Sequence, residues 1–205
     1  PRPQPHGPAR PGRPRPADRR PRRAGLDDAA GHREVFELCG EYMSRNESEL
    51  KSIAPGSPRL APLLRGRSAV AEFHRYHLLK WAQIEVHSLT REAREHENAE
   101  NKSRAAKAAL GIIDTALRSY PAEASLLESR ELLRDMIVSI SVSDWVEKAE
   151  RAAFEGDFAT ARELYRDALF YLGRDNVQSE ARSLAAEKIT AELDRIRHGE
   201  KDNDA

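Results

Sequence analysis

Two histidines three residues apart, His74 and His77, are the residues of this 205-residue chain whose type and spacing come nearest to a chemical site. On a helix this spacing places both imidazoles near one face, where they could share a metal ion. No carboxylate or third histidine follows at a matching interval, and His77 falls on an apolar stripe. We therefore expect both histidines to be packed residues and predict no metal site.

The rest of the sequence offers no catalytic motif. It lacks the zinc-binding H-E-x-x-H, the phosphate-binding G-x-x-x-x-G-K-[ST], the dinucleotide-binding G-x-G-x-x-G and the nucleophile motif G-x-S-x-G. The single cysteine, Cys39, excludes an intramolecular disulfide and a cysteine zinc cluster. We predict a protein that is not an enzyme, has no cofactor and resides in a reducing, cytoplasmic compartment. No run of about 20 apolar residues is present that could span a membrane.

Residues 144–172 are expected to form two short helices that fold against each other. Small and aromatic residues recur here at intervals of three or four, the spacing of one helix face, and Gly156-Asp157 breaks the chain between the two helices. The alanines would let the helix axes approach closely, and the aromatic rings would fill the space around them. The residues of this pattern are Trp145, Ala149, Phe158, Ala161, Tyr165 and Ala168.

The order of these residues resembles the tetratricopeptide (TPR) repeat. The large aromatic of the repeat's first helix falls on Trp145 and its small residue on Ala149. The small-aromatic-small series of the second helix falls on Ala161, Tyr165 and Ala168. Two positions depart from the pattern, because Ala152 stands where an aromatic is usual and Gly173 where a proline is usual. The alternative is a generic alanine-rich hairpin in an unrelated bundle.

A partial echo of a TPR second helix lies at 105–121. It consists of Ala109, Ile113, Ala116, Leu117 and Pro121. The two echoes are more than one repeat period apart, so we expect 123–140 to be an extra helix, followed by a new helix that starts at Ser143 or Asp144. The resemblance implies an all-α fold in which antiparallel helical hairpins stack as a short, irregular TPR-like array, with one long helix upstream.

We assign a TPR-like domain to 67–199, preceded by a short helix with a proline-rich loop at 31–66 and followed by a frayed tail at 200–205. The first helix should turn Val35, Leu38, Cys39 and Tyr42 inward, and 52–66 should be a loop. The long helix is predicted to carry the apolar stripe Phe73, His77, Trp81 and Ile84. The charged stretch at 90–107 is either a solvent-exposed helix or a break near Asn98.

The net charge of zero conceals an asymmetry. The first 24 residues contain eight arginines, eight prolines and one acidic residue, Asp18, so they carry a charge of +7 and leave −7 on the rest. This composition predicts a disordered arm over 1–30. The arginines would give weak, salt-dependent contacts with nucleic acid. No aromatic residue interleaves them for base stacking.

The resemblance also implies a binding face, because TPR grooves are lined mainly by the exposed face of each first helix. On this chain that face comprises Ser143, Val146, Glu147, Glu150 and Phe154. An acidic, partly apolar groove favours a basic or amphipathic segment by charge complementarity. We therefore expect a non-enzymatic adaptor or scaffold that binds another protein. The alternative is a structural helical bundle or coiled-coil subunit that self-associates as a homo-oligomer.

Overall fold

A computed structural model of the chain describes residues 28–173 and 180–203. The predicted arm and its nucleic-acid contact lie outside these residues, apart from the last three positions of the arm. The described residues form helices and no strands, which confirms the predicted all-α class. The helices are α1 (Ala29–Ser52), α2 (Leu60–Glu95), α3 (Ala99–Ser119), α4 (Ala124–Phe154), α5 (Phe158–Gly173) and α6 (Glu180–Asn203).

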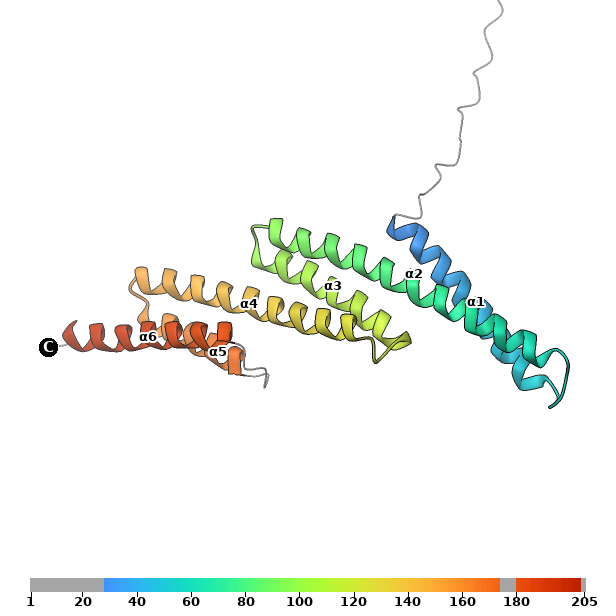
Figure 1. Cartoon of the computed structure of the whole chain (residues 1–205). Helices are drawn as coiled ribbons and strands as arrows, with labels where there is room; N and C mark the ends of the chain where they lie inside the picture. The colour runs from blue at the N-terminus through green and yellow to red at the C-terminus, as the bar shows by residue number, and fades with distance from the viewer. Residues whose placement is uncertain (1–27, 174–179, 204–205) are drawn as a thin grey trace, which may run out of the picture.

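The helices form an elongated stack (Figure 1). Each helix packs mainly against the helices that precede and follow it in the chain. Successive helices run in opposite directions, so the architecture is a row of antiparallel hairpins, with α1 at one end and α6 at the other. The 36-residue α2 is the predicted long upstream helix.

Helix α4 joins the two halves of the stack because different positions along it enter different parts of the core. Leu126 and Leu133 pack in the cluster formed with α2 and α3. Val142 and Ala149 pack in the cluster formed with α5 and α6. Between them Ile137 closes a third cluster with alanines of α2 and α3. A single long helix therefore spans what would otherwise be two separate cores.

The expected boundary at residues 140–144 is wrong, since α4 runs without a break from Ala124 to Phe154. Ser143 and Asp144 are suitable N-cap residues, yet they lie in the middle of this helix. The sequence between Ala124 and Phe154 contains no glycine or proline, so nothing stops the helix from continuing through them. The expected extra helix at 123–140 and the first helix of the hairpin are one element.

The N-terminal hairpin also differs from expectation. Only 53–59 connects α1 to α2, because α2 begins at Leu60 and accommodates Pro62 in its first turn, where an unbonded backbone nitrogen is tolerated. The predicted inward faces are partly correct, since His77 and Trp81 of the α2 stripe are buried as expected. Leu38, Tyr42 and Phe73 are exposed. The residues that lie between α1 and its neighbours are His32, Phe36 and Asn46 on α1 and His74, His77 and Trp81 on α2.

The charged stretch after α2 contains a break. Helix α2 ends at Glu95, and Asn98 caps α3 by accepting hydrogen bonds from the backbone nitrogens of Glu100 (2.7 Å) and Asn101 (3.4 Å). Of the two alternatives left open by the sequence, the break near Asn98 is therefore correct. It allows α3 to fold back on α2 and places the start of α3 beside the second half of α4.

The turn between α4 and α5 has the chemistry predicted from Gly156-Asp157. Gly156 adopts φ 85°, a conformation that favours glycine. The nitrogens of Gly156 and Asp157 donate to the carbonyls of Ala153 (3.1 Å) and Ala152 (2.9 Å), the two bonds of a Schellman motif. Asp157 then accepts a bond from the Thr160 nitrogen at 3.0 Å. This turn brings α5 back along α4.

Candidate functional site

Four of the five predicted binding residues lie together on one exposed side of α4. Ser143, Glu147, Glu150 and Phe154 are exposed, and their spacing of three or four residues places them in one row. We call this row the open face of α4. Val146 is separated from it, because its side chain packs against the core formed with α5 and α6.

Part of the open face borders a groove of about 970 Å³ between α3 and α4. Ser143 and Glu147 line it from α4, and the start of α3 lines it from the other side. The groove arises because the second half of α4 continues past the end of the α2–α3 hairpin (Figure 1). The helix dipole at the start of α3 adds positive potential to that side of the groove.

The charges of this α3–α4 groove are nearly balanced, with five basic and four acidic residues along its walls. On α4 each carboxylate that lines the groove forms an ion pair with a basic residue four positions later: Asp144 with Lys148 (2.7 Å) and Glu147 with Arg151 (3.3 Å). Such exposed pairs contribute only about 0.3–0.5 kcal/mol each. They are therefore weak enough to exchange for pairs with a partner. On α3, Lys102 and Lys107 form no ion pair with any described residue.

At the C-terminal end of α4, outside the α3–α4 groove, the open face carries a carboxylate and an aromatic ring. Glu150 forms no ion pair among the described residues, and Phe154 is 93% exposed at the end of α4. Burial raises the pKa of the Tyr165 hydroxyl on α5, and the negative charges of Glu150 and Glu192 raise it further. Glu150 is thus close enough to α5 to act on a core residue, while remaining open to solvent.

The packing role predicted for His74 and His77 is confirmed, because both side chains are buried. The sequence did not indicate their partners. His77 Nδ1 lies 2.9 Å from His32 Nδ1, and His74 Nδ1 lies 2.7 Å from the Tyr120 hydroxyl. Burial lowers the pKa of both histidines, and the nearby His32 lowers that of His77 further. The described residues contain no group of three or more His, Cys, Asp or Glu suited to a metal ion.

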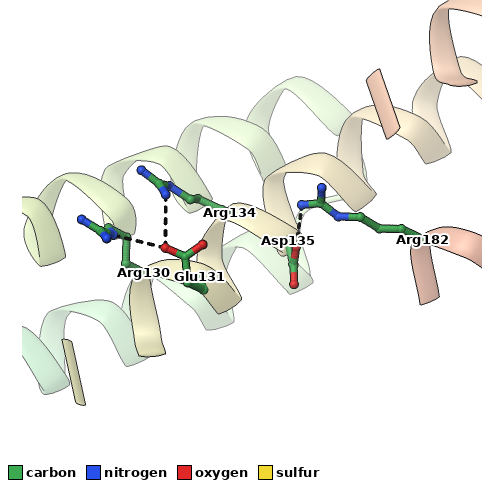
Figure 2. Close-up of polar contacts among 5 residues, drawn as sticks. All are labelled: Arg130, Glu131, Arg134, Asp135 and Arg182. Atoms are coloured by element: carbon green, nitrogen blue, oxygen red, sulfur yellow. Dashed lines mark hydrogen bonds and ion pairs between the residues drawn. The ribbon is translucent and has the colours of Figure 1, made fainter. Parts of the chain in front are cut away.

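An ion pair ties α6 to the middle of α4 (Figure 2). The almost fully buried Arg182 donates to Asp135 at 2.5 Å across helices that are not consecutive in the chain. One turn earlier on α4, Arg130 and Arg134 both pair with Glu131 (Figure 2). The Asp135–Arg182 contact helps to hold α5 and α6 on one side of α4, which leaves the open face free.

The fold and these surfaces define the class of protein as an open all-α stack of antiparallel helices with grooves between them. Comparisons with protein-family models, curated proteins and solved structures found no match to this chain. Among the described helices, none combines the length and apolar character needed to cross a membrane.

Proposed function

We propose that this chain is a non-enzymatic, TPR-like adaptor that binds a basic or amphipathic segment of another protein through the open face of α4. The observation that carries the proposal is Phe154, a large aromatic side chain left 93% exposed on the same side of α4 as Glu147 and Glu150. Aromatic residues, phenylalanine among them, are enriched in the cores of protein interfaces.

The helical hairpin behind this face supports the TPR-like classification. Ala149 of α4 and Ala161 and Ala168 of α5 are fully buried, which allows the two helices to approach closely. Tyr165 fills the space between these alanines and is also buried. With these residues engaged in the core, the opposite side of α4 is available for a partner. The one free cysteine, Cys39, fits a reducing compartment such as the cytoplasm.

A photocrosslinking experiment tests the proposal. Benzoylphenylalanine would replace Phe154 in one variant and Phe170, which is 73% exposed on α5, in the matched control. The probe is an amphipathic helical peptide with leucines on one face and lysines on the other. We expect crosslinking from position 154 and little from position 170. Equal crosslinking from both positions would show that the peptide adheres to any exposed aromatic.

A second candidate function is self-association, favoured by exposed apolar side chains on the α1–α2 hairpin. Leu38, Tyr42, Phe73 and Tyr76 are all more than 40% exposed. Such a surface is typical of an interface when its side chains form one patch. Mass measured by sedimentation over a wide concentration range separates the two functions. A monomer at every concentration argues against self-association, and a dimer lost in Leu38→Glu/Phe73→Glu supports it.

A further inference from the structure

A second groove, distinct from the open face, lies between α2 and α4. These two helices flank α3 (Figure 1). All three helices contribute to the walls of a groove of about 580 Å³. We call it the α2–α4 groove. Its volume is within the range of about 300–1,000 Å³ that is typical of ligand-binding clefts.

The floor of the α2–α4 groove is apolar. Leu79 and Val86 of α2 lie along it, with Ile113 of α3 and Leu126 of α4. The last two are buried core residues, whereas Leu79 and Val86 are only partly buried. The groove therefore exposes the edge of the hydrophobic core. Apolar side chains of a partner would be removed from water on this floor, which contributes about 25 cal/mol per Å².

The rim of the same groove is basic. His87, Arg91 and Arg94 project from successive turns of α2, and no acidic residue is among the described residues that line the groove. Arg94 forms no ion pair with any described residue, and Arg91 has only a loose, exposed pair with Glu95 at 3.7 Å. Two guanidinium groups are thus available to carboxylates, which they bind in a fork geometry.

The wall on the opposite side of the groove is polar and uncharged. Ser125 and Ser129 line the groove from the first turns of α4. Glu123 is the N-cap residue of α4, but its side chain bonds to no backbone nitrogen of the helix; its carboxylate accepts hydrogen bonds from Arg75 (2.6 Å) and from the Ser125 hydroxyl (3.1 Å). The first turn of α4 contains no acidic residue, but the Glu123 carboxylate lies at the start of the helix, so the helix dipole adds no uncompensated positive charge to the groove. The positive charge of the groove therefore comes from Arg91 and Arg94 of α2.

We propose that the α2–α4 groove binds an acidic amphipathic segment of a partner protein. The segment's apolar side chains lie on the floor formed by Leu79, Val86 and Ile113, and its carboxylates pair with Arg91 and Arg94. The site differs from the open face of α4 in position and in the sign of its charge, because the open face presents the carboxylates of Glu147 and Glu150. The stack would then hold two segments of opposite charge at separate places.

The test uses two fluorescent helical peptides with identical leucines, one with glutamates and one with lysines at every polar position. Fluorescence anisotropy with the full chain measures their affinities. We expect the glutamate peptide to bind, and Arg91→Glu/Arg94→Glu to weaken it by about tenfold or more, since reversing two rim charges removes attraction and adds repulsion. Val86→Ser should weaken it as well, with little change in salt dependence.

The matched control is Arg195→Glu/Arg197→Glu, which makes the same charge change at exposed positions of α6. It should leave the affinity within about twofold. If the α6 control weakens binding as much as the groove variant, the attraction is non-specific and the proposal fails. The proposal also fails if the lysine peptide displaces the glutamate peptide from the groove. It fails as well if the wild-type chain forms a dimer that Arg91→Glu/Arg94→Glu abolishes, because a second copy of the chain is then the occupant. Arg91→Gln/Arg94→Gln repeats the test if the charge reversal unfolds the chain.

Discussion

The Nδ1 atoms of His32 and His77 lie 2.9 Å apart in the contact between α1 and α2. Both side chains are buried, at 5% and 8% exposure, and the Tyr76 ring packs against each imidazole. A hydrogen bond at this distance requires one Nδ1 to carry a proton and the other to accept it. No carboxylate among the described residues bonds to either ring, so a second proton would be uncompensated.

The first prediction concerns pH. The pKa of His77 is lowered by burial and by His32, and that of His74 is lowered by burial. At pH values below 6.5, the ordinary pKa of histidine, these two histidines therefore bind more protons in the unfolded chain than in the folded chain. The free energy of unfolding should be highest above that pH and fall as pH decreases below it. Urea denaturation at a series of pH values from 8 down to 5 measures this.

His77→Gln is the informative variant for this prediction, because glutamine can still donate and accept but does not titrate. It should flatten the decline in stability between pH 7 and 5. His87→Gln, an exposed histidine on the same helix, should leave the decline unchanged. If His77→Gln retains the full pH dependence of wild type, the buried pair is not its source.

A second prediction concerns the contact between α2 and the end of α3. Tyr120→Phe removes the hydroxyl that lies 2.7 Å from His74 Nδ1 and leaves that buried nitrogen without its partner. We expect a loss of about 1–2 kcal/mol in the free energy of unfolding. Tyr76→Phe is the control, since the Tyr76 hydroxyl makes no hydrogen bond among the described residues, and its effect should be under about 0.5 kcal/mol. Equal effects would contradict the assignment.

Two glycines give a third prediction with opposite signs. Gly156→Ala places a Cβ on a backbone at φ 85° and should destabilise the chain by about 1 kcal/mol. Gly111→Ala lies within α3, where an added Cβ meets nothing within 4 Å, and should stabilise the chain by about 0.5–1 kcal/mol. Thermal unfolding of both variants checks this. A Gly156→Ala variant as stable as wild type would show that the Schellman turn does not require glycine.

The fourth prediction concerns the ion pair between α4 and α6. Asp135→Ala removes the carboxylate that accepts from the buried Arg182 at 2.5 Å, and should cost about 1–3 kcal/mol. Hydrogen exchange should become faster in α6 more than in α2. Glu192→Ala removes an exposed partner of Arg195 within α6 and should cost under about 1 kcal/mol. A larger effect from Glu192→Ala would mean that the interhelical pair is not what anchors α6.

Local chemistry explains what the sequence predicted well. The Gly156-Asp157 turn and the buried alanines Ala161 and Ala168 follow from preferences that act within a few residues. The break at Asn98 was one of two alternatives that the sequence left open. The open face of α4 was also largely predicted, since a period of 3.6 residues fixes which side chains share a side once one of them is buried.

The predictions were wrong where the local sequence is compatible with more than one structure and tertiary packing decides between them. Ser143 and Asp144 can cap a helix, but α4 continues through them because its N-terminal half packs on α3 and its C-terminal half packs on α5. The inward faces of α1 and α2 were misplaced in part, because His32 and His74 lie in the interface whereas Leu38 and Phe73 are exposed. Burial of His32 and His74 depends on partners far away in the sequence, such as His77 for the first and Tyr120 for the second. The sequence did not predict the α2–α4 groove, because its walls are also formed by residues that lie far apart in the sequence.

The most direct measurement for the central claim is the affinity of the lysine-bearing amphipathic peptide for wild type and for Glu147→Lys/Glu150→Lys, by isothermal titration calorimetry at 0.15 M salt. The claim that the open face of α4 binds a basic segment predicts saturable binding to wild type and an affinity about tenfold lower or worse in the variant. An affinity that is the same for both proteins, with the variant still folded, would contradict it.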